Sequence, residues 1–220
     1  MIVAIIQARF NSTRLPGKVL MDIEGKPMLQ RVIERVAKSK LIDHIIVALP
    51  WREEDYNWLV PLTIKCGVSH YLHRHYSEDD VLGRYYQACP SDARAVVRIT
   101  SDCPLIDPRV IDRTIQYFLD NDIDYIYNLP PYPDGLDTEV FSYEALVKTY
   151  NEVTEPYDRE HVTTYIRSHP ELFRIGRLEG KGLSLKWSVD TIDDLIFARR
   201  VYHILGEEFD FEDILKLEEK

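Results

Sequence analysis

The chain has 220 residues, with 37 acidic residues against 27 lysines and arginines, which gives a formal net charge of −10. A nucleic-acid coat or a membrane-surface binder requires a basic surplus, so neither nucleic acid nor membrane is an expected partner. A hydrophobic fraction of 45% is enough for a buried core that needs no disulfide bonds to stabilise it. We therefore expect one domain spanning residues 1–220.

Cysteine usage and the N-terminus indicate a reducing compartment. The three cysteines form no Cys-x-x-Cys pair, so the sequence predicts neither a disulfide framework nor a thiolate zinc site. The apolar run at residues 2–6 is much shorter than a membrane-spanning helix and has no basic leader. We expect a cytoplasmic protein without a targeting signal.

Strands and helices are expected to alternate along the first part of the chain. Short apolar runs, typical of strands that are buried on both faces, predict strands at 2–8, 44–49, 68–72, 95–100 and 124–128. Helical spacing of apolar residues predicts helices at 27–37, 78–89 and 108–120. This alternation is typical of crossover units and predicts an α/β fold with a mostly parallel sheet.

The pattern changes after the proline-rich segment 130–135. Beyond it the sequence predicts a strand at 138–141, helices at 143–151 and 156–168, strands at 173–178 and 183–189, and terminal helices from residue 191. No linker is long enough to separate two domains. We interpret the segment as the seam of a sub-region, 130–188, within one domain.

The loop after the first predicted strand gathers positive charge in an acidic chain. Arg9, Arg14 and Lys18 lie within ten residues of one another. Ligands of α/β sheets bind at the carboxyl ends of strands, and guanidinium and ammonium groups suit phosphate oxygens. Because Gly17 is the only glycine of the loop, the sequence matches neither the P-loop nor the dinucleotide-binding fingerprint, both of which need more than one glycine. We interpret it as a polyphosphate site, with a solvated basic turn as the alternative.

Two aspartates, Asp102 and Asp190, each follow a predicted strand directly. Carboxylates delivered to one edge of a sheet can hold magnesium, which prefers hard oxygen ligands and shares itself with substrate phosphates. The alternative is helix capping, which Asp107 fits before its own helix. For Asp190, ahead of Thr191, the residues alone favour the cap.

Two other groups of reactive side chains receive structural interpretations. His70, His73 and His75 are close in sequence, but the first lies inside a predicted strand and no fourth ligand is evident, so a zinc site is not favoured. Cys103 lies beside Asp102, but no motif pairs it with a base. We interpret Cys103 as a packing residue.

Ordered motifs extend over nearly the whole chain, from residue 2 to about residue 202. They are IIQAR, STRLPGK and GKPML (within 5–29), SEDDVLGRYY (77–86), DCPLID (102–107), YPDGLD (132–137), REHV (159–162) and VDT (189–191). In this order they resemble the cytidylyltransferase family that includes the CMP-Kdo and CMP-sialic acid synthetases. The sequence is most similar to the SpsF-type spore coat polysaccharide biosynthesis proteins.

The resemblance implies a Rossmann-like three-layer fold of the nucleotide-diphospho-sugar transferase type, and transfer of CMP from CTP with release of pyrophosphate. It implies that CTP is held by residues of the first loop: Gln7, Ala8, Arg9, Ser12, Arg14 and Lys18. It also implies that Asp102 and Asp190 ligate Mg²⁺, which reverses the preference for a cap at Asp190. The implied catalytic residues are Arg14, Lys18, Asp102 and Asp190.

The sub-region 130–188 is expected to bind the acceptor. The candidate residues are Tyr132, Asp134, Asp137, Glu139, Arg159 and His161, which suit a polar, anionic molecule. A simple turn at Asp134 and exposed helix charges around Arg159 are the alternatives. Related synthetases are typically dimers, so the resemblance also implies a homodimer.

The sequence departs from the family pattern at three places. Phe10 and Asn11 stand where Met-Gly is expected, Ser101 stands where Gly is usual, and residues 74–76 read Arg-His-Tyr where Phe-Arg-Gly is more typical. Asparagine also tolerates a left-handed backbone, so the first change is expected to be silent. The last leaves the base or ribose contacts open.

The leading interpretation is a magnesium-dependent cytidylyltransferase that activates a sugar acid or related polar acceptor for surface polysaccharide biosynthesis. Two alternatives stay open. One is a nucleotidyltransferase that acts on a phosphonate or phosphate acceptor instead of a sugar. The other is a catalytically silent nucleotide-binding subunit, against which the presence of Arg14, Lys18, Asp102 and Asp190 argues.

Overall fold

The computed structural model describes residues 1–74, 77–128, 131–178 and 182–218. At its centre is a seven-stranded sheet in the order β5-β4-β1-β6-β8-β7-β9. Its strands are β1 (Ile2–Gln7), β4 (His44–Pro50), β5 (Ser69–His73), β6 (Ala95–Thr100), β7 (Tyr125–Tyr127), β8 (Glu139–Ser142) and β9 (Ile175–Arg177). Among the described strands of this sheet, β8 alone runs antiparallel to its neighbours. The predicted mostly parallel sheet is confirmed.

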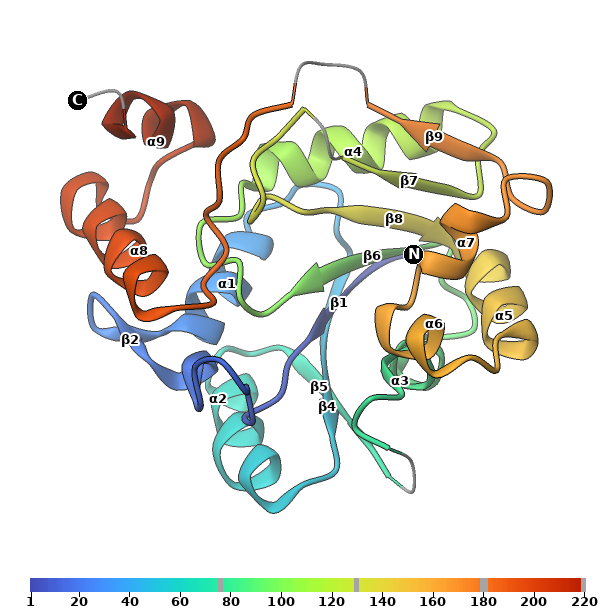
Figure 1. Cartoon of the computed structure of the whole chain (residues 1–220), viewed down its shortest axis with the longest axis horizontal. Coiled ribbons are helices and arrows are strands. Elements are labelled where there is room, and N and C mark those ends of the chain that lie inside the picture. The colour runs from blue at the N-terminus through green and yellow to red at the C-terminus, as the bar shows by residue number, and fades with distance from the viewer. Residues whose placement is uncertain (75–76, 129–130, 179–181, 219–220) are drawn as a thin grey trace.

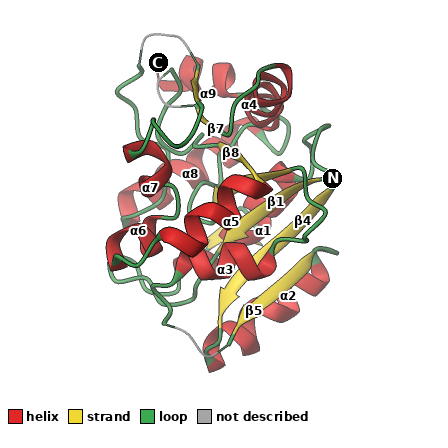
Figure 2. Ribbon diagram, turned by 90° about the vertical axis from the view of Figure 1, so that its right-hand side faces the viewer, coloured by secondary structure: helices red, strands yellow, loops and turns green. Residues whose placement is uncertain are grey.

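Helices cover both faces of the sheet, as Figures 1 and 2 show. One face carries α1 (Met28–Val36), α2 (Val60–Lys65), α4 (Pro108–Asp120), α8 (Ile192–Leu205) and α9 (Phe211–Glu218). The other carries α3 (Val81–Ala88), α5 (Tyr143–Glu152), α6 (Pro156–His161) and α7 (Thr164–Ser168). Successive side chains of β1 alternate between the two cores: Ala4 and Ile6 enter the first, and Val3 and Ile5 enter the second. The three-layer arrangement is thereby confirmed.

Besides the short 3-10 helix η1 (Lys18–Leu20), two structured segments are missing from the sequence prediction. The first is α2 together with the π-helical turn that precedes it, η2 (Asp55–Leu59). Its exposed aromatic side chains, Tyr56 and Trp58, obscure the apolar spacing of a helix. The second is a hairpin of β2 (Asp22–Ile23) and β3 (Lys26–Pro27), whose strands are too short to show alternation.

The predicted helix at 156–168 is wrong as one element. The structure has two short helices, α6 and α7, separated at Val162, whose φ is +63° and ψ is −56°. The Thr163 N–H donates to the His161 carbonyl across this residue at 2.6 Å, which makes a γ-turn. A buried β-branched residue with positive φ cannot be recognised from apolar spacing.

The predicted strand at 183–189 is also wrong. In the described part of this segment, 182–189, the structure has a single bridge, between Lys186 and Asp134. Trp187 and Val189 are nevertheless buried. The apolar alternation therefore indicates burial of every second side chain and not the hydrogen-bond ladder of a β-strand. Backbone bonds to distant segments hold this segment, including the bond from the Trp187 N–H to the Asp134 carbonyl at 2.7 Å.

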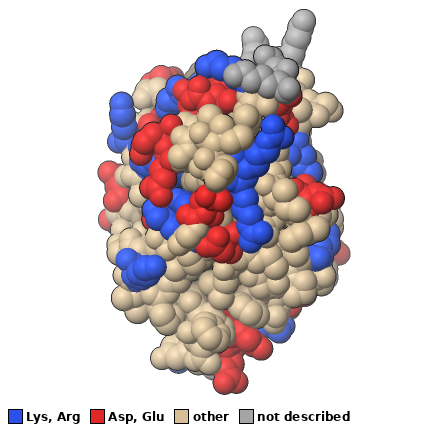
Figure 3. Space-filling view, turned by 90° about the vertical axis from the view of Figure 1, so that its left-hand side faces the viewer, with Lys and Arg blue, Asp and Glu red and all other residues tan. Residues whose placement is uncertain are grey.

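Acidic and basic side chains are interspersed on the face that carries α8 and α9 (Figure 3). Lys26 and Arg31 both contact Glu207, and Lys38 contacts Glu208. The net negative charge therefore does not form a uniform acidic field on this face. Within the described ranges, no helix is both long and apolar enough to cross a membrane.

Gly135 allows the turn that follows Tyr132 to pack against the segment before α8. Its φ is +101°, and an added Cβ would lie 2.6 Å from the Ser188 nitrogen and from the Trp187 carbonyl carbon. We predict that Gly135→Ala destabilises the protein by about 2 kcal/mol, because backbone on the opposite side cannot yield easily. Thermal unfolding should show a melting temperature that is lower by about 5 °C.

Gly67→Ala is the matched control. Gly67 also has a positive φ, +71°, but no atom lies within 4 Å of its added Cβ. The Gly67→Ala variant therefore measures the cost of backbone strain at a positive φ without a steric clash. An equal loss of melting temperature in the two variants would contradict the predicted clash.

Candidate active site

The side chain of Lys18 lies at the centre of a polar network at the carboxyl edge of the sheet. The loop 9–17 leaves β1 and ends at Gly17, whose left-handed backbone (φ +70°) leads into the 3-10 helix η1 (Lys18–Leu20). The Lys18 Nζ donates to Asp102 Oδ2 at 3.0 Å, to Asp190 Oδ1 at 3.2 Å and to the Val189 carbonyl at 2.7 Å. Because Lys18 is buried, the alternative of a solvated basic turn does not fit it.

Asp102 is held in its ionised form by this ammonium. It follows β6 directly, and its carbonyl accepts from the Val189 N–H at 2.8 Å. Burial acts to raise the pKa of Asp102, but the charge and hydrogen bond of Lys18 outweigh it and leave that pKa below the ordinary value. A carboxylate that is stable in this way can face a second cation.

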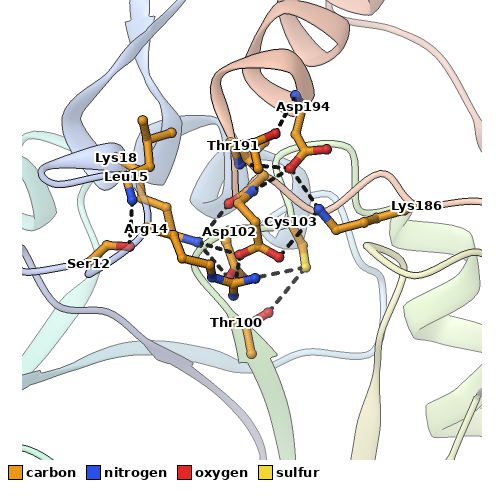
Figure 4. A network of polar contacts seen from close by, with 12 residues as sticks. Ser12, Arg14, Leu15, Lys18, Thr100, Asp102, Cys103, Lys186, Thr191 and Asp194 are labelled. Carbon is orange, nitrogen blue, oxygen red and sulfur yellow. Dashed lines mark hydrogen bonds and ion pairs between the residues drawn. The ribbon is translucent and has the colours of Figure 1, made fainter.

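Thr191, and not Asp190, caps α8, and Figure 4 shows Thr191 beside Asp194. The N-cap is Thr191, which forms a capping box with Asp194, so the capping alternative for Asp190 is wrong. The Asp190 carboxylate is instead directed toward cations: Arg14 Nη2 lies 2.7 Å from Oδ1, and Lys186 Nζ lies 3.4 Å from Oδ2. Asp107, by contrast, is the N-cap of α4, as the sequence predicts.

A cleft of about 340 Å³ opens beside this network. The predicted residues that line it are Gln7, Ala8, Arg9, Ser12, Arg14, Lys18, Asp102 and His161. Asp190 is not among the residues that line the cleft, but its carboxylate contacts Lys18 and Arg14, which do line it. The structure therefore brings the predicted nucleotide-binding residues together at the carboxyl ends of β1 and β6.

Several cleft residues are missing from the sequence prediction. They are Thr13, Val19, Val81, Arg84, Arg98, Thr100, Ser101 and Glu160. Arg98 and Thr100 are alternate residues of β6, so they share one face of the sheet. A charged Arg98 inside an apolar strand is the signal that could have found this pair.

Five of the six predicted acceptor residues do not line this cleft. Tyr132 and Asp134 line a separate, open depression together with residues 182–186. Asp134 also belongs to a tight turn, in which the Leu136 N–H donates to the Pro133 carbonyl, so the turn alternative is borne out in the backbone. The structure separates these two residues from His161.

The other three predicted acceptor residues are engaged within the protein. Glu139 pairs with Arg98 at 2.7 Å across the β6–β8 ladder. Arg159 donates to Asp80 at 2.7 Å. Asp137 accepts from the Gly135 N–H at 2.7 Å, and burial raises its pKa to about 6.

The histidine and cysteine candidates do not form a metal site among the described residues. His70 contacts Thr63, and His73 lies 3.6 Å from Asp80, while His75 lies outside the described residues, as does Pro130 at the start of the expected sub-region. Within residues 1–74, 77–128, 131–178 and 182–218, no three His, Cys, Asp or Glu side chains are grouped to hold a metal. Burial raises the pKa of the Cys103 thiol, which agrees with a packing role.

Known proteins share both the sequence and the fold. The family model described as Cytidylyltransferase matches residues 3–219, which confirms the resemblance found in the sequence. The spore coat polysaccharide biosynthesis protein SpsF of Bacillus subtilis is 33% identical over 216 residues, covering 94% of this chain and 88% of that protein. An uncharacterised protein of Methanocaldococcus jannaschii is 38% identical over 218 residues, covering 97% and 86%. The solved structure of a cytidylyltransferase from Leptospira borgpetersenii has a TM-score of 0.91 at 29% identity, covering 98% and 92%.

Removal of the Lys18 ammonium should destabilise the protein even without any ligand. Lys18→Met leaves Asp102 and Asp190 facing each other at a largely buried site, and breaking a buried ion pair from one side costs about 3 kcal/mol. Chemical denaturation measures this loss. Lys26→Met is the matched control, because Lys26 also bridges two carboxylates, Glu34 and Glu207, but at the surface.

The control should lose about 1 kcal/mol or less, since exposed ion pairs contribute little. An equal loss in the two variants would contradict the view that the buried charges of the site depend on Lys18.

Proposed function

This chain belongs to the cytidylyltransferase family, and we propose that it transfers CMP from CTP to a sugar acid or related polar acceptor, with release of pyrophosphate. One observation carries the proposal: the cationic loop after β1 and the carboxylate after β6 line the same cleft. A triphosphate needs cations along its length, and a metal that it brings needs carboxylates. Because the relative from Bacillus subtilis is a spore coat polysaccharide biosynthesis protein, we propose surface polysaccharide biosynthesis as the pathway.

Arg14 and Lys18 are the proposed partners of the triphosphate. Arg14 is 67% exposed in its side chain, so its guanidinium can turn from Asp190 to a ligand without breaking a buried bond. Lys18 lies deeper, with its ammonium directed to the edge where Asp102 and Asp190 meet. Together they neutralise the β- and γ-phosphates and the charge that develops on the leaving pyrophosphate.

Asp102 and Asp190 fit a magnesium ion. One oxygen of each lies within 3.2 Å of the same Lys18 nitrogen, so the two carboxylates are close together and would hold the ion between them and the phosphates of the substrate. Hard carboxylate oxygens and substrate phosphates are the ligand set that magnesium prefers. Such an ion supplies Lewis-acid polarisation of the α-phosphate when it is bound.

The reaction requires no covalent intermediate with the protein. The acceptor oxygen forms a bond to the α-phosphorus while the bond from that phosphorus to the pyrophosphate oxygen breaks. The contribution of the protein is to hold the two reactants in line and to balance charge. The thiol beside the site supports this view, since burial of Cys103 raises its pKa and keeps it protonated.

The acceptor is expected in the part of the cleft that is lined by residues of β6 and α6. Arg98, Thr100 and His161 line that part of the cleft with polar groups, and Glu139 orients Arg98 from the neighbouring strand. Arginine and histidine beside hydroxyl groups suit a polar molecule that carries an acid group. This arrangement favours a sugar acid or a related anionic acceptor.

Pyrophosphate release from CTP, measured with magnesium over a panel of sugar acids, phosphonates and phosphorylated alcohols, tests the proposal. With the best acceptor, Lys18→Met and Asp102→Asn should each lower kcat/KM by about 100-fold or more, because each removes charge stabilisation from the transition state. Lys26→Met, a bridging lysine outside the cleft, should retain normal turnover. Near-normal turnover in either active-site variant, or a preference for UTP over CTP, would overturn the assignment.

Metal removal provides an independent test. The protein treated with a chelator should release no pyrophosphate, and addition of magnesium should restore the activity. Asp190→Asn should need a higher magnesium concentration for half-maximal rate, because one anionic ligand is lost. Full activity in the chelated protein would refute the metal site at Asp102 and Asp190.

A further inference from the structure

Phe10 holds the phosphate-binding loop by two backbone hydrogen bonds. Its carbonyl accepts from the Gly17 N–H at 3.2 Å, which closes residues 10–17 into a ring. Its N–H donates to Asp55 Oδ1 at 2.7 Å, which ties this ring to a separate part of the chain. The Phe10 ring also lies within 3.6 Å of the position that a Gly17 side chain would take. The loop therefore has one closure and one anchor at the same residue.

The anchor is a fully buried carboxylate. Asp55 has 0% of its surface exposed and is the first residue of η2, 45 residues away from Phe10 along the chain. A hydrogen bond from an N–H to an ionised carboxylate is roughly twice as strong as one between neutral groups. Asp55 is not among the residues that line the cleft, so it does not touch the proposed ligand.

The side-chain contacts of the loop are longer than the anchor or involve an exposed side chain. The Leu15 N–H reaches Ser12 Oγ at 3.5 Å, and Arg9 reaches Asp79 at 3.5 Å at the surface. Arg14 pairs with Asp190 through a side chain that is mostly exposed. Within the part of the chain that the structure describes, the other backbone bonds of residues 9–16 stay within residues 9–18, as when the Leu15 carbonyl accepts from the Lys18 N–H at 3.1 Å, and the Phe10 N–H alone reaches a distant residue.

We propose that Asp55 is a positioning residue of the nucleotide site, which fixes the phosphate-binding cations in place by anchoring Phe10. The inference rests on the proposed function, because it assumes that Arg14 and Lys18 bind the triphosphate. Without the anchor, the loop has to become ordered when the nucleotide binds, and that entropy is subtracted from the binding free energy.

The electrostatics of Asp55 provide a distinctive signature. Burial raises its pKa to about 6, against the opposing effects of the Phe10 N–H, of Arg84 on α3 and of Arg52, while Glu54 adds to the rise. At neutral pH the carboxylate is ionised and accepts strongly from Phe10. As the pH falls through about 6 the carboxyl takes up a proton, and the bond to Phe10 weakens.

Calorimetric titration with CTP and magnesium, at pH 7.5 and at pH 5.5, tests the proposal. At pH 7.5, Asp55→Ala should raise the Kd for CTP about tenfold, which corresponds to the loss of one net hydrogen bond. Asp55→Asn should restore most of the affinity, because its amide oxygen still accepts from the Phe10 N–H. The ratio of wild-type Kd to Asp55→Asn Kd should rise between pH 7.5 and pH 5.5, since only the wild type loses an ionised acceptor.

Asp43→Ala is the matched control. Asp43 Oδ2 accepts from the Ile2 N–H, also at 2.7 Å, but at the opposite end of β1. This variant should lower the melting temperature and leave the Kd for CTP unchanged. Thermal unfolding of every variant identifies any that fails to fold, and the pH ratio of Asp55→Asn then carries the test.

The outcomes separate the two proposals. A wild-type protein that binds no CTP overturns both the proposed function and the role of Asp55. A wild-type protein that binds CTP, together with a folded Asp55→Ala variant of equal affinity, overturns the role of Asp55 alone. So does a Kd in Asp43→Ala that rises as much as in Asp55→Ala, or a pH ratio for Asp55→Asn that does not change.

Discussion

The Lys18 ammonium is the interaction on which the geometry of the site depends. It joins the loop after β1 to Asp102, Val189 and Asp190, groups that lie 84 to 172 residues away in the sequence. Two carboxylates brought together at a mostly buried place repel each other unless a cation lies between them. The position of the chain before α8 is therefore set by charge balance around one nitrogen, in addition to apolar packing of Trp187 and Val189.

The order of the strands explains why these groups can meet. β1 and β6 are parallel neighbours, with Gln7 opposite Thr100 at their carboxyl ends. Whatever follows the two strands must leave from the same edge of the sheet. Asp190 reaches this edge without a strand of its own, through the backbone bond between Val189 and Asp102. The strand order therefore places Lys18 and Asp102, and a backbone bond between distant segments places Asp190.

This difference also explains which parts of the site the sequence could predict. Lys18 and Asp102 follow apolar runs that are recognisable as strands, and a parallel arrangement brings them together whatever the details of register. Arg98 meets Glu139 because β8 inserts between β6 and β7 out of chain order, in an antiparallel register that no local pattern encodes. The proposed role of Asp55 is hidden for a different reason, because this residue lies in a π-helical turn without helical apolar spacing.

Lys18 also links the two ligands of the proposed reaction. Lys18 faces both carboxylates, and Arg14 and Lys186 also contact Asp190, so these cations cannot pair fully with the carboxylates and with the phosphates of a nucleotide at the same time. If a divalent cation joins the carboxylates while phosphate joins Lys18 and Arg14, each of these charges keeps an opposite partner. Binding of the metal and of the nucleotide is then coupled, and by thermodynamic linkage each raises the affinity for the other by the same factor. In the proposed reaction, the cations that pair with Asp102 and Asp190 thus make the assembly of metal and triphosphate cooperative.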